Sequence, residues 1–388
     1  MACCCASLQH NAKVVCLEMS ALPSMALVLL ITCLLSPCAS VAQDGEARAQ
    51  DLLKRVERTV DGHVLPTLAD FSKKAHRLAD QLATFCASRD QAEMAGVKEA
   101  FGESVLAWAR AEHLRFGPLG PNGRSMRINF WPDPRGVTWR QMRRVLQAKD
   151  AALLDPDTLA KQSVAVQGLG ALEVILLRWS REPAAKAEEG QSSYECRYAE
   201  AIARNVANVS DQVMHDWKGE DGWRSRFLKP GPDNPVYRTA EEAAAQLTKS
   251  MLLGLALLQD QHVLVLFEFA TGERKRIKLP FRRSGLSVDY IRASTESLKQ
   301  LHEHFRLTDY ARGEVAWTKS WTEETFVTLN QTARRLKISD KGRLVKSELD
   351  VDTLRRLRFY TNGLRQIYGR ALAPAAGLTI GFNELDGD

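Results

Sequence analysis

The sequence predicts an all-α protein in which two helical-bundle halves pack together. Beyond the first 42 residues, apolar side chains recur at spacings of three and four, the period of one helix face. Strand-like alternation bounded by hairpin signals is nearly absent. The chain has 388 residues, 45% of them hydrophobic and 26% charged. It can therefore bury a substantial core, and its composition is not that of a disordered or fibrous protein.

The first 42 residues have the features of a signal peptide. Met25–Leu35 is an apolar run of eleven residues, too short to span a bilayer and typical of a signal core. Small residues follow in Ser40-Val41-Ala42, so we expect cleavage after Ala42 and a periplasmic protein. The alternative is a lipid anchor at Cys38, because Leu35–Cys38 has the outline of a lipobox, although its proline fits poorly.

The cysteines support this division of the chain. Six of the eight lie in the first 38 residues, which leaves Cys86 and Cys196 in a mature chain bound for an oxidising compartment. These two cysteines either form a disulfide or stay as buried free thiols. The sequence leaves both possibilities open.

Each helix is expected where the three-and-four spacing persists. The first three carry the apolar sets that begin at Leu52, Leu68 and Val97. The later helices are expected over Trp139–Lys149, Gln162–Trp179, Tyr194–Trp217, Ala240–Phe269, Val288–Arg306, Thr322–Leu336 and Leu349–Ala371. No stretch after the signal is expected to cross a membrane, because polar residues at 259–262 interrupt the apolar run Met251–Leu258.

Breaks in the pattern divide the chain. Arg115–Gly136 has four prolines and four glycines, which predicts a long ordered loop within the first half. Glu182–Gln191 is a candidate hinge, so the mature domain 43–388 is divided into halves of about 43–185 and 190–388. Leu228–Thr239 and Thr271–Gly285 are expected to be surface connections.

Glu173 is the first candidate for chemistry. In the helix predicted over Gln162–Trp179, it lies in the middle of the apolar face formed by Val166, Leu169, Leu176 and Leu177. A buried carboxylate must be protonated, paired with a cation such as an arginine, or bound to a metal. A purely structural pair between glutamate and arginine is the alternative to a functional role.

Neighbouring residues extend this candidate site. Gly168 and Gly170 are placed in the same helix, where they allow either close helix packing or room for a ligand. The loop Arg115–Gly136 contributes Trp131, Asp133 and several arginines, one of which is a candidate partner for Glu173. His113 and the pair in His302-Glu303-His304 lack good ligand spacing and are expected on solvated helix surfaces.

The residues around Glu173 resemble a known family. Gly168-Leu169-Gly170-Ala171-Leu172-Glu173 lies over the signature Gly-x-His-x-x-Glu of the imelysin-like family. The runs 115–119, 130–133, 163–168 and 381–388 are similar to the same family, and the resemblance covers essentially the whole mature chain.

The resemblance implies a bacterial periplasmic or surface-anchored protein of two helical halves, implicated in iron uptake and once classed as a peptidase. Gly170 stands where the family has its histidine. A His-x-x-Glu pair is a reasonable half-site for a transition metal, because residues three apart share a helix face. Glu173 alone predicts weak binding of iron or another transition metal.

The expected function is therefore a periplasmic binding protein of iron acquisition that handles a metal ion, a chelate or a partner protein. The expected ligand-binding residues are Gly168, Gly170, Glu173, Arg115, Trp131 and Asp133. Membrane components of iron uptake are the expected partners, and nucleic acid is not, because the net charge of +6 is thinly spread. A metal-dependent peptidase and a non-catalytic interaction module are the alternatives.

Overall fold

A computed structural model describes residues 43–88, 90, 92–181, 193–337, 346 and 349–381, without the side chain of residue 181. The predicted signal peptide with Cys38, the hinge 182–191 and the C-terminal residues 382–388 lie outside the described residues. Of the described residues, those from 49 to 381 belong to one compact unit and residues 43–48 to another. The described part is helical throughout its regular elements and contains no strand, which confirms the all-α prediction.

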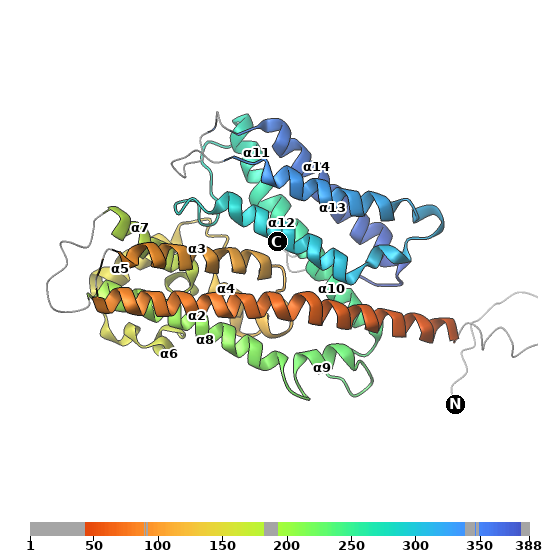
Figure 1. The fold of residues 1–388 in the computed structure, drawn as a ribbon, viewed down its shortest axis with the longest axis horizontal. Coiled ribbons are helices and arrows are strands. Elements are labelled where there is room, and N and C mark those ends of the chain that lie inside the picture. Colours follow the sequence, from red (N-terminus) through yellow and green to blue (C-terminus); the bar gives the residue numbers. More distant parts are fainter. Residues whose placement is uncertain are drawn as a thin grey trace, which may run out of the picture. The chain divides into compact units, whose positions relative to one another are not determined.

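The first group of helices is built around α2 (Leu65–Ser88), which a π turn at Val60–Val64 precedes. It packs between α3 (Glu93–Ala111) and α8 (Tyr194–Trp217), and Figure 1 shows the three side by side. The residues of α2 that recur at three and four, such as Leu68, Phe71, Leu78 and Leu82, are the buried ones. Helix α8 also packs on α7 (Leu169–Arg181), which in turn contacts α5 (Val137–Ala148).

The second group consists of α10 (Ala240–Ala256), α11 (Leu264–Thr271), α12 (Ser287–Phe305), α13 (Thr318–Arg334) and α14 (Val351–Ile367). Helix α13 packs between α12 and α14, and α10 contacts both of these (Figure 1). Helix α12 also packs on α3 of the first group. The two groups therefore share one continuous core.

Short elements connect the long helices. They are α4 (Arg124–Ile128), α6 (Pro156–Leu159), α9 (Trp223–Leu228), α15 (Ala373–Ala375), π turns at Leu257–Val263 and Tyr368–Leu372, and 3₁₀ turns at Gly117–Leu119, Pro121–Gly123, Ala151–Leu154, Val164–Val166, Leu307–Tyr310 and Gly313–Val315.

Two predicted boundaries were wrong. The loop Arg115–Gly136 contains the short helix α4. The helix expected from Gln162 begins at Leu169, because Gly168 has φ +82°, which a right-handed helix does not accommodate.

The helical run Ala240–Thr271 is long and apolar enough to cross a membrane by length and composition. The polar residues that were expected to interrupt it lie in the π turn Leu257–Val263, so the helical run continues through them. In the fold, 72% of its most apolar window is buried. Packing against α12 and α14 therefore accounts for its hydrophobicity.

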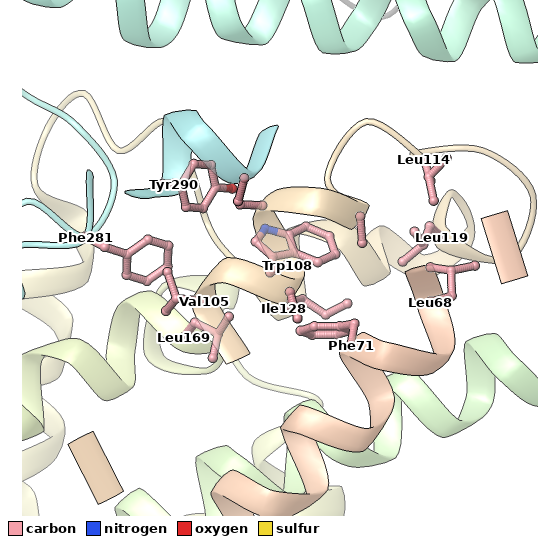
Figure 2. Packing of buried hydrophobic residues seen from close by; sticks show 14 of the residues in the cluster. Leu68, Phe71, Val105, Trp108, Leu114, Leu119, Ile128, Leu169, Phe281 and Tyr290 are labelled. Atoms are coloured by element: carbon pink, nitrogen blue, oxygen red, sulfur yellow. The ribbon is translucent and has the colours of Figure 1, made fainter. Parts of the chain in front are cut away.

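The core extends from the first helix group to the segment before α12. Phe71 and Trp108 pack with ring centroids 5.4 Å apart. Figure 2 shows Phe281 beside Val105 and Leu169, which come from α3 and α7. A residue from the connection Thr271–Gly285 thus lies inside the core, so this connection is not the simple surface loop that was expected.

A disulfide joins α2 to α8. Cys86 and Cys196 are bonded, with their Cα atoms 5.7 Å apart. Of the two possibilities that the sequence left open, the structure has the disulfide.

Candidate functional site

A cavity of about 340 Å³ lies against the first turns of α7. Its walls are the loop from Asn129 to Gly136 with the start of α5, the α7 residues Gly170 and Glu173, and the segment Ile277–Arg283. The cavity therefore contains four of the six predicted ligand-binding residues, which are Gly170, Glu173, Trp131 and Asp133.

Glu173 is buried, as its place on an apolar helix face predicts, with 8% of its surface exposed. Its Oε1 accepts hydrogen bonds from the Ser284 backbone N–H at 3.0 Å and the Ser284 hydroxyl at 2.7 Å. Burial raises the pKa of Glu173, while the Ser284 hydrogen bonds and the charges of Arg283 and Arg282 act against that rise. The carboxyl group of Glu173 thus connects α7 through hydrogen bonds to the segment that precedes α12.

The expectation that an arginine of the loop 115–136 pairs with Glu173 was wrong. Arg115 bonds Glu112 at 2.7 Å, and Arg124 bonds Asp216 at 2.6 Å. Arg127 donates to the side-chain oxygens of Gln167 and Asn205, each at 3.3 Å. Arg115 lines a separate cavity of about 300 Å³ beside Trp223 and Tyr237.

The two glycines have different roles. A Cβ on Gly168 would lie 2.4 Å from the Arg127 carbonyl oxygen and 2.5 Å from that of Ile128, so Gly168 permits close backbone packing beside the site. A Cβ on Gly170 would meet only the Asn129 Oδ1, at an ordinary 3.5 Å. Gly170 therefore leaves open the space that a side chain at this position would fill.

Asp133 and Trp131 build the opposite wall. The two carboxylate oxygens of Asp133 accept from the backbone N–H groups of Val137, at 2.7 Å, and Thr138, at 3.0 Å. Asp133 is therefore an N-terminal cap of α5. Trp131 lines this cavity and also a second one, of about 570 Å³.

The third wall of the cavity, Ile277–Arg283, was not predicted from the sequence. Six of the ten residues in 274–283 are Arg or Lys, a density that could have singled out this segment. Lys278 donates to the Pro134 carbonyl, and the Arg283 guanidinium lies 4.0 Å from the centre of the Trp139 ring. Phe281 has φ 51°, a left-handed conformation unusual for a bulky residue, while its side chain is buried in the core.

The donor set does not fit a resident transition metal. The two carboxyl groups that line the 340 Å³ cavity are those of Asp133 and Glu173, and both accept backbone hydrogen bonds. Within the described part of the chain, no three His, Cys, Asp or Glu side chains are grouped so that they could hold a metal ion. Because Gly170 replaces the histidine of the family signature, α7 provides a single candidate metal ligand, Glu173. One oxygen of that carboxyl group already accepts hydrogen bonds from Ser284.

His113 and His302 are buried, contrary to expectation, while His304 is half-buried. His113 is 3% exposed and lies against His63, with their Nε2 atoms 3.4 Å apart. His302 is 5% exposed and its Nδ1 lies 2.8 Å from the Tyr368 hydroxyl. Ser250 of α10 donates to the His113 carbonyl, and Phe326 of α13 stacks on His302 with ring centroids 4.7 Å apart. The local sequence pattern does not reveal these contacts with distant helices.

Together, the fold and the cavity define an all-α protein of two packed helix groups with a cationic cavity where α7 meets the segment before α12. The chain belongs to the Imelysin family, whose model matches residues 64–348.

Two solved structures share the fold. An imelysin-like protein from Psychrobacter arcticum 273-4 is 18% identical, covers 86% of this chain and 98% of its own length, and has a TM-score of 0.67. An iron-regulated protein A precursor from Parabacteroides distasonis ATCC 8503 is 12% identical, with coverage of 84% and 95% and a TM-score of 0.66. No curated protein matches the sequence significantly.

Proposed function

We propose that this protein is an exported ligand-binding member of the Imelysin family that takes part in iron acquisition. Its ligand site is the 340 Å³ cavity between the Trp131 loop, α7 and Ile277–Arg283. One observation carries the proposal: Glu173 and Gly170 line the same cavity. The buried carboxyl group of Glu173 therefore lies beside space that a side chain at position 170 would otherwise occupy. The ligand is a cargo that the protein binds without changing it.

The iron-related name of one structural neighbour supports the choice of cargo. The predicted signal peptide, and the pairing of the two cysteines that would remain after its removal, support a periplasmic location, because disulfides persist in oxidising compartments. Membrane components of iron uptake are the proposed partners.

The proposal is tested with a variant whose new side chain fills the 340 Å³ cavity. Gly170→Phe places a benzyl group in the open space without backbone strain, because Gly170 has an ordinary helical conformation. Calorimetric titration of the purified protein with ferric citrate and with a ferric hydroxamate complex should show binding by the wild type and a loss of at least about tenfold in the variant, as expected when a ligand pocket is filled.

Gly231→Phe is the matched control, since a Cβ there meets no atom within 4 Å and Gly231 lines neither cavity beside Trp131. Circular dichroism should show the same helix content in all three proteins. Unchanged binding by a folded Gly170→Phe variant, or no binding of either iron complex by the wild type, would overturn the proposed site.

A further inference from the structure

The segment 274–283 concentrates positive charge beside the proposed site. It lines the 340 Å³ cavity through Lys278, Arg282 and Arg283, and the 570 Å³ cavity through Arg274, Lys275, Arg276 and Lys278. The two cavities share Trp131, Asp133, Pro134 and Lys278 as lining residues. These shared residues make the two cavities neighbours, and we refer to them together as the cationic recess.

The negative groups of the recess are Asp133, Glu173 and Asp260, and all three are engaged; Asp260, which lines the larger cavity, is paired with Arg365 at 3.4 Å. Both carboxylate oxygens of Asp133 accept hydrogen bonds from backbone N–H groups at the N-terminus of α5. Oε1 of Glu173 accepts two hydrogen bonds from Ser284. Among the cations, Arg274 is paired with Glu268 at 2.6 Å. Arg135, Lys278, Arg282 and Arg283 surround the smaller cavity, so positive charge exceeds negative charge on its walls.

Two hydrogen-bond donors in the same walls lack acceptors. Asn129 is 3% exposed, and its Nδ2 has no hydrogen-bond partner. The buried Nε1 of Trp131 also has none. Buried donors are usually satisfied, so these two lining residues offer donors to the acceptors of a ligand. The Nε1 atoms of Trp108 and Trp217 are unpartnered as well, in the core outside both cavities. Rotation of the Asn129 amide by half a turn brings Nδ2 to the side of Gly170, where Oδ1 now lies 3.5 Å from the position of a Cβ on that glycine.

We infer that the recess binds an oxyanion ligand with several carboxylate or phosphate oxygens, rather than a bare metal cation. Lys278 and Arg282 supply charge, and the Asn129 amide and the Trp131 indole supply neutral donors to its oxygens. This inference rests on the proposed function: in iron acquisition, such a ligand is an anionic chelate whose carboxylates hold the ferric ion. Free carboxylates and inorganic phosphate share the same chemistry.

The test compares probes of opposite charge. Citrate, inorganic phosphate, ferric citrate, the ferric hydroxamate complex and zinc ion alone are titrated into the purified protein by calorimetry. We expect citrate or phosphate to bind the wild type. Ferric citrate binding more tightly than citrate identifies the chelate as the source of the oxyanion, and the reverse order identifies the free anion.

Charge-removing variants give the decisive comparison. Lys278→Gln and Arg282→Gln should each weaken binding of the anion by about tenfold, the scale of one charge-assisted hydrogen bond. Arg334→Gln is the control, since this arginine is exposed on α13 with a side-chain exposure of 73% and lies outside both cavities. Glu173→Gln keeps an oxygen for Ser284 and removes a negative charge from the cavity wall, so it should tighten anion binding.

The outcomes separate this inference from the proposed function. If the hydroxamate complex binds and Gly170→Phe blocks it, while no anion binds, the ligand site stands and the oxyanion inference falls. Zinc binding that Glu173→Gln abolishes would also overturn the inference. Anion binding that persists at wild-type strength in both Lys278→Gln and Arg282→Gln would do the same, because those charges would then take no part.

Discussion

At the scale of single residues, alanine substitutions at the two glycines near Glu173 should change the free energy of unfolding in opposite directions. Gly168→Ala puts a Cβ at φ +82° against two carbonyl oxygens, so it should lower the free energy of unfolding by about 2–4 kcal/mol. Gly170→Ala adds a methyl group where space is open in a helix, so it should raise that free energy by up to about 1 kcal/mol. Urea denaturation of both variants measures the difference, and equal effects would contradict it.

Residue types predicted part of this site. A glutamate in the middle of an apolar helix face requires burial and a partner, and Glu173 has both. The identity of the partner could not be predicted, because Ser284 lies 111 residues further along the chain and its approach depends on how the two helix groups pack. Gly168 was wrongly predicted to lie inside the helix, because an apolar sequence pattern does not reveal that its φ is positive.

At the scale of elements, the disulfide between α2 and α8 should contribute strongly to stability. It closes a loop with a sequence separation of 110, which restricts the unfolded chain. The double variant Cys86→Ala with Cys196→Ala should lose about 2–5 kcal/mol of unfolding free energy. Urea denaturation checks this, and the wild type in a reducing agent should behave like the variant, which itself should not respond to the reducing agent. Equal stability of the oxidised wild type and the variant would show that the bond adds nothing.

Helices were predictable where the apolar period is regular, and their interruptions were not. Tyr194–Trp217 has the expected bounds of α8 because its buried positions keep the helical period throughout. The run from Ala240 was predicted as one helix, yet a π turn at Leu257–Val263 lies within it and includes His262. His262 is buried beside Tyr290, with ring centroids 5.5 Å apart. One π turn changes the period too locally for an apolar pattern to reveal it.

At the scale of the whole molecule, composition concealed the distribution of charge. A net charge of +6 over 388 residues is too thinly spread to indicate an anionic partner such as nucleic acid. The fold nevertheless places the six cations of 274–283 along two cavities and fastens the segment through Ser284 and Phe281. Because these tethers join residues far apart in sequence, the cavity could be predicted only as a groove near Glu173 and the Trp131 loop.

Burial of histidines across the whole molecule should make its stability depend on pH. Burial lowers the pKa of His63 to about 3 and the pKa of His262 and His302 to about 4, and it holds the pKa of His113 well below its usual value. In the unfolded chain these imidazoles protonate near pH 6.5. Between pH 6.5 and about 4 the unfolded state therefore binds more protons than the folded state, so stability falls as the pH falls.

The two carboxyl groups whose pKa is raised by burial, Glu173 and Asp260, work in the opposite direction. Both act above their ordinary pKa values near 4, where each adds stability as the pH falls. Each histidine contributes a slope of up to about 1.4 kcal/mol per pH unit, and four histidines therefore dominate from pH 6.5 to 5.

Urea denaturation at pH 7, 6 and 5 should show a decreasing free energy of unfolding. His302→Gln should flatten this dependence, because glutamine does not titrate and retains a polar group for the Tyr368 hydroxyl. Val327→Gln is the control, since that side chain is 44% exposed on α13 and its replacement changes no titratable group. The same slope in wild type and His302→Gln would mean that His302 is not held neutral by the fold.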